Sequence, residues 1–540
     1  MPQDAFTLRL NALELDKQLR GGKINRINQP EREEVTLTIY TGGATKKLVL
    51  NANASDCGAY FTEIAKENPA LAPGFCMLLR KHLLNAEIKE VSLVGFERIL
   101  AFKLFCTSDF STAERVLYAE IMGKYSNLIL TENGVILGAL KTTSVGDGCK
   151  RLIFPGAKYA LPEPQDKIDP THFSALQNLF DPPPEGELSH FLFTHVRGIA
   201  PVTAEQIVDA YRGGEFAKHV YDFLFSDEIS ACVTERDFFA RQKEGARQFP
   251  TLSEAQEYFY EQRQINKQFE ALRRKLESVL NAAVKKQEKR LVQIAEKSEE
   301  CKDAERNRIY GELLTANLWR IPNGARGIEL ENFYEDGRTE KILLDPMRAP
   351  SENAQDYFKK YRKQKRTLET LAPMRESAER EITYLHSLRA SLGFAKDTED
   401  LVSLSEEFAE EALVAPQSTG KKKQPTKPFR TYEKDGFVVL AGRNNLENDK
   451  LIRSSRLDDI WLHAQKYHSC HVVIKTEGRK VPDEVLLFAA SVCARYSDGK
   501  GDRVPVDYCE IKFVKKPPKS KPGFVIYTNY KTVLAEPANE

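Results

Sequence analysis

Four side chains able to bind a metal ion lie within nine residues near the C-terminal end: His463, His468, Cys470 and His471. Imidazole nitrogens and thiolate sulfurs are the common protein ligands of zinc. Their spacing matches no standard zinc site, and the nine cysteines of the chain, scattered from position 57 to 509, include no CxxC pair. We therefore expect no metal site, no disulfide framework and no cofactor.

Other polar residues of the same region suit sugar–phosphate recognition. A predicted short loop carries Arg443, Asn444, Asn445, Asn448 and Asp449. A second group alternates with prolines and predicts an extended basic strip that could follow an RNA backbone: Lys515, Lys516, Lys519 and Lys521. Trp461 could stack on a base, but a buried tryptophan is the favoured interpretation.

The formal net charge of +1 hides an asymmetry along the chain. Residues 421–531 hold 23 Lys and Arg against 13 Asp and Glu, whereas residues 1–420 hold 56 against 63. A basic C-terminal module behind a more acidic body is typical of a polyanion-binding domain on a scaffold. The alternative, which charge alone leaves open, is a lysine-rich solvated surface.

Length and composition limit the class of protein. A chain of 540 residues is too long for one hydrophobic core, so we expect several domains. No apolar run approaches the roughly 18 to 20 residues of a membrane span, and the first residues lack the features of a signal peptide. We therefore expect a cytoplasmic protein, and a surface adhesin is disfavoured.

The elements that must position these residues begin with a mixed α+β domain at 1–160. Strand-like runs at 35–40 and 47–50 flank a glycine turn, and a second hairpin with Asn-Gly at its turn spans 128–137. Residues 75–83 have helical apolar spacing. A proline-rich linker follows at about 160–185.

Residues 186–250 predict a compact helical domain. Helices at 187–196 and 203–211 flank a tight turn at 197–201, which is the pattern of a helix-hairpin-helix. Gly198 would let the backbone approach closely, and amides at the start of the second helix could bind a phosphate. A packed helix–glycine–helix with no ligand is the alternative.

A long antiparallel arm is predicted for 255–395. Apolar residues from Ile265 to Ala283 step by four and three, as in a coiled coil, and a second helix is expected from Asn353 to Leu392, with a kink or break at Pro373. A hairpin turning at Asp336 and Gly337 would form a tip at about 326–349. An acidic stretch at 397–411 and a flexible linker at 416–425 precede the basic module, 421–535.

Several blocks resemble the NFACT family, in the family's order and across nearly the whole chain. They are FCMLLRKHL at 75–83, GFERI at 95–99, EIMGKYSN at 120–127, RGIAP at 197–201, NAQDYFKKY at 353–361, GRNNLEND at 442–449, DIWLHA at 459–464, HVVI at 471–474, VPVDY at 504–508 and VKKP at 514–517. The resemblance implies a multidomain α+β protein. Its N-terminal domain would resemble the formamidopyrimidine-DNA glycosylase fold, followed by the helix-hairpin-helix, the arm and an RNA-binding domain.

The resemblance also implies a bacterial ribosome-associated quality control factor of the RqcH type, related to the eukaryotic nuclear export mediator factor. Such proteins bind large ribosomal subunits that carry peptidyl-tRNA and recruit alanyl-tRNA for C-terminal alanine tailing, with an Hsp15-like RNA-binding protein as a further partner. Peptidyl transfer belongs to the ribosome, so we expect no catalytic residues, no membrane contact and no DNA.

The family pattern places tRNA contacts in the N-terminal domain, at Glu97, Arg98, Glu120, Ile121, Met122 and Lys124. From the family blocks and the local residue types together, we expect RNA or ribosome contacts at Gly198, Arg443, Asn444, Asn445, Asn448, Asp449, Trp461, His463, His471, Lys515, Lys516, Lys519 and Lys521. For Ile121 and Met122 a core position is an equal alternative. Glu97 stands where the family has an aspartate. Whether the longer glutamate preserves alanine tailing is therefore a question that the sequence raises and does not answer.

Two other classes are weaker. A glycosylase would use an N-terminal proline and an adjacent glutamate, but Pro2 is followed by Gln3, which cannot accept a proton as a carboxylate does. Some family members are named fibronectin-binding proteins, and a moonlighting adhesin is the second alternative.

Overall fold

The computed structural model describes residues 3–108, 111–143, 151–163, 165–181, 186–335, 338–414, 429–499 and 501–538. The chain divides into two compact units, Met1–Gln264 and Ile265–Glu540. The finer division into four domains stays a prediction. The predicted linker at 416–425, the tip residues Asp336 and Gly337, and Pro2 lie outside the described residues.

The first unit is built on a nine-stranded antiparallel sheet in the order β4-β3-β2-β1-β5-β6-β7-β8-β9. Both predicted hairpins, β2–β3 and β8–β9, are confirmed. The strands are β1 (Lys23–Glu31), β2 (Glu34–Thr41), β3 (Ala44–Asn51), β4 (Gly58–Phe61), β5 (Glu87–Leu93), β6 (Ile99–Ser108), β7 (Ser111–Glu120), β8 (Asn127–Glu132) and β9 (Val135–Ala139).

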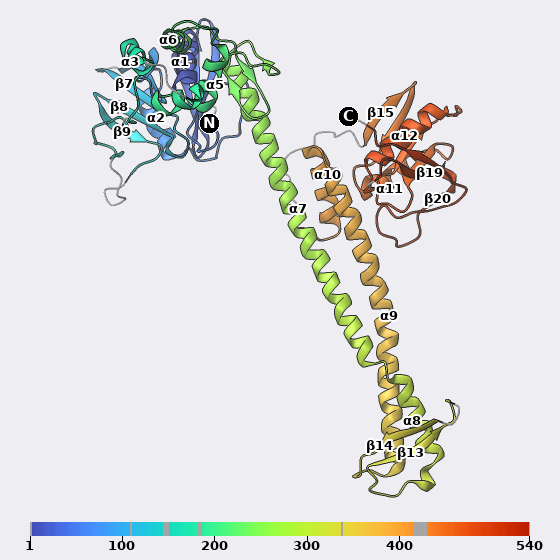
Figure 1. Cartoon of the computed structure of the whole chain (residues 1–540). Coiled ribbons are helices and arrows are strands. Elements are labelled where there is room, and N and C mark those ends of the chain that lie inside the picture. The colour runs from blue at the N-terminus through green and yellow to red at the C-terminus, as the bar shows by residue number, and fades with distance from the viewer. Residues whose placement is uncertain are drawn as a thin grey trace. The chain divides into compact units, whose positions relative to one another are not determined.

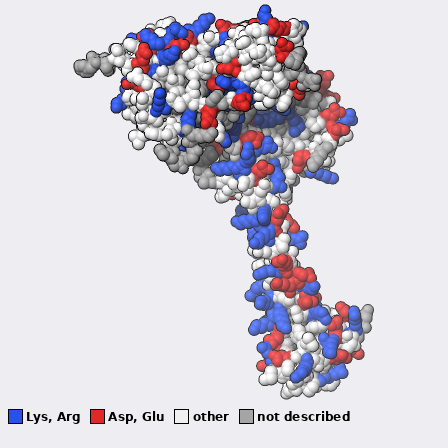
Figure 2. All heavy atoms as spheres, turned by 60° about the vertical axis from the view of Figure 1, so that its left-hand side comes forward, with Lys and Arg blue, Asp and Glu red and all other residues white. Residues whose placement is uncertain are grey.

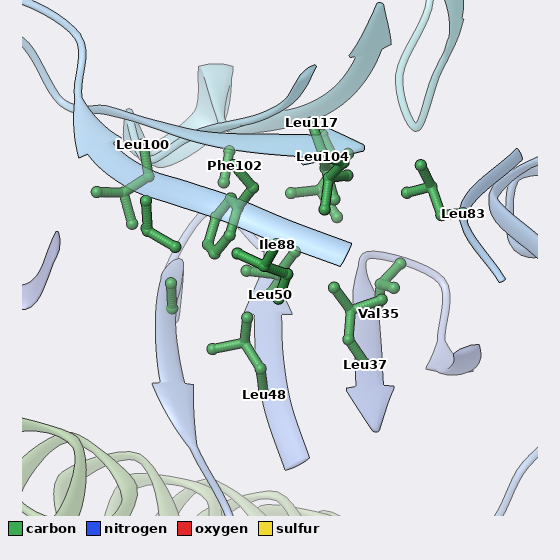
Figure 3. Packing of buried hydrophobic residues seen from close by; sticks show 14 of the residues in the cluster. Val35, Leu37, Leu48, Leu50, Leu83, Ile88, Leu100, Phe102, Leu104 and Leu117 are labelled. Carbon is green, nitrogen blue, oxygen red and sulfur yellow. The ribbon is translucent and has the colours of Figure 1, made fainter. Parts of the chain in front are cut away.

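Two helices pack their apolar residues into the core that this sheet forms. Helix α1 (Ala5–Leu19) contributes side chains such as Leu8 and Leu15, and the predicted helix α2 (Gly74–Leu83) contributes Leu79 and Leu83. Figure 3 shows side chains from β2, β3, β5, β6 and β7 pointing toward one another in this core. The packing fixes the ends of β6 and β7, where the candidate tRNA contacts lie.

A helical segment completes the first unit and shares a second core with the start of α1. The turn at 197–201 separates α4 from α5 as predicted, and the side chain of Asp4 joins the two segments by accepting from the Ala200 amide at 2.8 Å. The elements are α3 (Phe173–Leu179), α4 (Leu188–His195), α5 (Pro201–Ala210), α6 (Phe216–Phe225), β10 (Cys232–Val233), β11 (Phe238–Phe239) and β12 (Arg247–Gln248).

Two long helices dominate Figure 1: α7 (Leu252–Glu300) and α9 (Pro350–Phe394). Their 49 and 45 residues correspond to about 74 and 68 Å at the rise of an α-helix. Helix α9 continues through Pro373, so the predicted alternative of a break there is wrong, and the alternative of a kink stays a prediction. No helix in the described part of the chain combines the length and apolar character that a membrane span requires.

The long helices share a core between the middle of α7 and the C-terminal part of α9, and a third helix that the sequence did not predict joins this core. Leu276 and Leu280 of α7 share a core with Leu385 and Leu388 of α9 and with helix α10 (Thr398–Glu410). Regular coiled-coil packing along the arm stays a prediction. Figure 2 shows both signs of charge interleaved along the narrow helical stalk.

The other end of the arm carries the predicted hairpin, β13 (Gly327–Asn332) and β14 (Arg338–Leu343), paired antiparallel. It packs with α8 (Ala304–Ala316) and the first turns of α9 around a small core that includes Leu313, Leu330 and Ile342.

The C-terminal module is α+β, as predicted, with a sheet in the order β15-β16-β18-β17-β19-β22. One face packs on helix α12 and the other on helix α11. The elements are β15 (Arg430–Lys434), β16 (Phe437–Ala441), α11 (Asn445–Arg453), β17 (Ile460–Ala464), β18 (Val472–Lys475), α12 (Asp483–Arg495), β19 (Val504–Glu510), β20 (Val514–Lys515), β21 (Ile526–Tyr527) and β22 (Lys531–Ala535).

Candidate nucleic-acid interface

The candidate tRNA residues of the first unit come together at one end of β6 and β7. Glu97 and Arg98 form the turn between β5 and β6, and Ile99 is the register partner of Glu120 at the end of β7. The Ile121 amide donates to the Arg98 carbonyl oxygen at 2.8 Å. Strand pairing therefore brings together two motifs that are more than 20 residues apart.

Glu120 and Ile121 support this site rather than form its surface. The Glu120 side chain is 1% exposed, and its carboxylate accepts from Arg151 at 2.5 and 2.9 Å and from the Tyr159 hydroxyl at 2.9 Å. Ile121 is also 1% exposed. Burial leaves neither side chain available for direct contact, so the prediction that they touch tRNA is not supported, although they hold the Arg98 backbone in place.

The side chains beside them are accessible. Lys124 is exposed and Met122 is half-buried. Tyr125 is 69% exposed, and the Lys124 ammonium lies 4.8 Å from the centre of its ring. An exposed aromatic ring beside a cation suits stacking on an unpaired base. Tyr125 stands within the motif at 120–127 but is not among the contacts predicted from the sequence, since its residue type alone does not show whether the ring is buried or exposed.

Glu97 lies among charges contributed by two segments. Arg197, from the turn before α5, places its Nε 3.7 Å from the Glu97 carboxylate and also contacts Asp169 at 3.4 Å. Partial burial raises the pKa of Glu97, and the opposing charges of Arg197 and Arg98 limit that rise. The carboxylate thus links the Glu97–Arg98 turn to the helical segment.

Gly198 has a packing role at this junction. Its φ is +76°, its carbonyl oxygen accepts from the Ala5 amide at 2.8 Å, and an added Cβ would lie 2.6 Å from the Phe96 carbonyl oxygen. The sequence suggested that Gly198 allows a close backbone approach. In the structure, the groups that approach Gly198 are Phe96 and Ala5 of this same chain. The predicted RNA contact at Gly198 stays untested.

Gly198→Ala is expected to destabilise the first unit by about 1 to 3 kcal/mol, because it adds crowding to an unfavourable φ. Gly134 has a φ of +77° with nothing within 4 Å of an added Cβ, so Gly134→Ala measures the cost of φ alone. Amide hydrogen exchange of α1 in both variants, read by mass spectrometry, checks the prediction. Similar exchange in both would show that the approach to Phe96 is not a tight contact.

In the second unit, the predicted short loop at 443–449 is instead the start of helix α11, which begins at Asn445. Asn444 is the N-cap, and its side chain accepts from the Glu447 amide at 2.9 Å. Asn448 accepts from the His471 amide at 3.0 Å. The asparagine side chains that suggested sugar–phosphate recognition are thus buried, and they cap α11 and bond it to the backbone next to β18.

Acidic residues of α10 form ion pairs with the arginine of this motif. Arg443, whose side chain is 9% exposed, contacts Asp400 at 3.2 Å, Glu399 at 3.4 Å and Glu447 at 3.6 Å. Arg430 donates to the same Asp400 at 2.7 Å. Two guanidinium groups therefore share one buried carboxylate, which fixes the module on the helix.

Glu407 makes a second joint between the same elements. Its carboxylate, which is fully buried, accepts from the Asn445 amide and side chain, both at 3.0 Å, and from the Tyr384 hydroxyl at 2.6 Å. Burial raises the pKa of Glu407 to about 7, against the effect of these donors. Asn445 therefore belongs to the joint and not to an exposed surface.

Two lysines of the predicted basic strip form ion pairs within this chain, and the strip is not extended. After β20 the chain turns: the Ser520 amide bonds to the Pro517 carbonyl oxygen, and Lys519 has a φ of +62°. Lys521 pairs with Glu411 at 2.5 Å and with Glu381 at 3.1 Å. Lys516 pairs with Asp449. Lys515 and Lys519 remain exposed.

The expectation that Trp461 is buried is confirmed, since it is 0% exposed. Its ring centre lies 5.3 Å from that of His471 and 5.7 Å from that of His463. Burial lowers the pKa of His463 to about 4 and lowers the pKa of His471 well below its usual value. Both histidines are therefore neutral members of an aromatic cluster. No group of potential metal ligands occurs in the described part of the chain.

Comparison with known proteins accounts for both sets of motifs. Residues 4–427 match the family described as NFACT N-terminal and middle domains, and residues 427–527 match the NFACT protein RNA binding domain. The chain belongs to the NFACT family. The RNA-binding domain of this NFACT protein is thus the module that the charge asymmetry indicated.

Full-length NFACT relatives align with nearly all of the chain. A protein named Rqc2 homolog RqcH from Bacillus subtilis is 35% identical over 558 aligned residues, covering 97% of this chain and 96% of the relative. Its namesake from Streptococcus suis is 30% identical and covers 100% of this chain and 99% of the relative. Among solved structures, the N-terminal part of a fibronectin/fibrinogen-binding protein from Streptococcus suis is 27% identical, covers 48% of this chain and 99% of its own, and has a TM-score of 0.45.

Proposed function

We propose that this chain is a ribosome-associated quality control factor that binds the large ribosomal subunit and tRNA in the cytoplasm. The observation that carries the proposal is the alignment of proteins named Rqc2 homolog RqcH with nearly the full length of the chain. An RNA-binding domain at 427–527 agrees with an RNA partner. The accessible side chains of Met122, Lys124 and Tyr125 beside Arg98 support a separate tRNA contact in the first unit.

In the finer form of this proposal, the chain binds large subunits that carry peptidyl-tRNA and recruits alanyl-tRNA, so that alanines are added to the stalled peptide without mRNA and mark it for degradation. The ribosome supplies the peptidyl-transfer chemistry, and an Hsp15-like RNA-binding protein is a further partner. The likeness of the first unit to formamidopyrimidine-DNA glycosylases and the helix-hairpin-helix assignment also belong to this proposal, and both rest on the sequence resemblance.

The proposal is tested by sequencing the RNA that co-purifies with the tagged full-length chain from bacterial lysate. We expect large-subunit rRNA and a narrow set of tRNAs, with little small-subunit rRNA. Recovery should fall steeply as salt rises, because cations released from RNA dominate the free energy of phosphate contacts. A tagged variant that ends at residue 414 serves as the control for the basic module and should recover less rRNA. Equal recovery of both subunits, or of neither, would overturn the proposal.

A further inference from the structure

On the side of the RNA-binding domain that carries the family motif, most polar side chains interact with other residues of this chain. Arg443 and Arg430 bond to Asp400, Asn445 bonds to Glu407, and Lys521 bonds to Glu411. An RNA phosphate could reach Arg443, Arg430 or Asn445 only by displacing carboxylates from a buried joint. Another surface of the domain must therefore supply most of the phosphate contacts, if this joint stays closed.

The opposite side of α11 and the loop after it form such a surface, which we name the α11 basic face. Lys450 and Arg453 are exposed, and they lie one turn apart on α11. Arg456 and Leu457 follow in the loop, both exposed, and the Leu457 carbonyl oxygen accepts from the amide of exposed Lys512 at 3.1 Å. Four cations from two segments therefore line one patch around an apolar side chain.

The loop that carries Arg456 is held firmly. Buried Asp459 accepts from the Arg456 amide at 2.9 Å and from the Thr476 amide at 3.0 Å. The Lys475 ammonium donates to Asp459 and to the Ser455 hydroxyl, both at 2.9 Å. A cation on a preorganised loop loses less conformational entropy when it binds a phosphate.

The charges on this face are largely unbalanced. Lys450, Arg453 and Arg456 make no ion pair with the described part of the chain. Lys512 pairs with Glu510, and Asp458 accepts from the Thr476 hydroxyl at 3.0 Å. The four cations of this face outnumber its two acids, Asp458 and Glu510, and this excess of positive charge beside an apolar side chain matches a run of phosphates with sugars or bases between them.

We infer that the α11 basic face is the surface through which this domain binds the phosphate backbone of large-subunit rRNA. The inference rests on the proposed function for the identity of the RNA. It assigns the contact to Lys450, Arg453, Arg456 and Lys512, and it assigns the family motif on the other side of α11 to the joint with α10.

The test compares two charge reversals in the full-length chain. Arg453→Glu/Arg456→Glu alters the α11 basic face. Lys466→Glu/Arg503→Glu makes the same change in charge at the opposite end of β17 and β19, where the Gln465 amide bonds to the Pro505 carbonyl oxygen. The affinities for purified bacterial large subunits and for protein-free large-subunit rRNA are measured at salt concentrations from about 50 to about 200 mM, together with melting curves.

We expect the first variant to bind both probes about tenfold or more weakly. Its plot of log affinity against log salt should be shallower by about 0.7 to 0.9 for each phosphate that the variant no longer binds. The second variant should bind like wild type. Arg453→Gln/Arg456→Gln should give a smaller reduction of the same kind, which separates the removal of attraction from added repulsion. All four side chains that these variants replace are exposed, so unchanged melting is expected.

Four results would overturn the inference. Wild-type affinity in the first variant would show that this face does not bind RNA, and weaker binding in the second variant alone would place the contact at the other end of the strands. Weaker binding to subunits with full binding to protein-free rRNA would assign the face to an acidic ribosomal protein. If wild type itself binds neither probe, the proposed function fails and the inference falls with it.

Discussion

Arg443→Ala is expected to lower the free energy of unfolding of the second unit by about 3 kcal/mol. Removing one partner of a buried ion pair costs about 3 to 5 kcal/mol, because the other charge stays buried. Arg443 contacts Asp400, which is 4% exposed, and Glu447, whose side chain is 10% exposed. The lower end of the range applies, since Arg430 still neutralises Asp400.

Intrinsic fluorescence can measure this change without a label. Both tryptophans of the chain lie in the second unit: Trp461 is fully buried in the module, whereas Trp319 is 82% exposed. Exposure of Trp461 during denaturant unfolding will therefore dominate the spectral shift. The control is Arg453→Ala, an exposed arginine at the end of the same helix, which should change stability by less than about 0.5 kcal/mol.

Arg443 and Arg453 should also differ in their effects on RNA binding. With Arg443 as a joint residue, Arg443→Ala should leave the salt dependence of rRNA binding unchanged wherever the variant is folded. Arg443→Lys should recover only part of the stability, because an ammonium cannot reproduce the fork of guanidinium donors. Wild-type stability combined with weak RNA binding in Arg443→Ala would restore the direct contact that the sequence predicted.

Arg98→Ala is expected to weaken tRNA binding by about 10- to 150-fold, since a charge-assisted contact to phosphate contributes about 1.5 to 3 kcal/mol. The protein should still sediment with large subunits, because the RNA-binding domain supplies separate contacts. Filter binding with bacterial tRNA and co-sedimentation with large subunits measure the two outcomes, and a tailing assay on large subunits should show that alanine tailing is lost. The control is Lys103→Ala on the same strand β6, whose lysine is exposed and pairs with Glu90 at 2.7 Å.

Variants of Glu97 separate its charge from its length. Glu97→Asp restores the family residue and should leave tailing unchanged or improve it. Glu97→Gln should impair tailing, because it removes the charge that lies between Arg197 and Arg98. An ordinary surface ion pair would instead change stability by less than about 1 kcal/mol and leave tRNA binding intact. Wild-type tRNA affinity in Arg98→Ala would refute the site, even though membership of the NFACT family would stand.

Local patterns gave correct predictions where one segment is sufficient to define the structure. The Asn-Gly turn of β8–β9, the glycine turn of β2–β3 and the apolar spacing of α2 depend on neighbours within about ten residues. Helix α10 was missed because its many acids hid its apolar stripe. Leu401, Leu404 and Phe408 recur at helical spacing and are buried, while Asp400 and Glu407 of the same helix accept hydrogen bonds from the C-terminal module.

The sequence by itself determined the family, the α+β class, the long helices and the basic C-terminal module, because motifs, periodicity and charge are properties of the chain. Only the tertiary structure decided which motif residues are accessible. Arg443, Asn445 and Lys521 seemed free to bind phosphate until folding placed Asp400, Glu407 and Glu411 against them. Whether a cation meets a carboxylate of its own chain or a phosphate of a partner depends on residues distant in sequence, and folding alone brings those together.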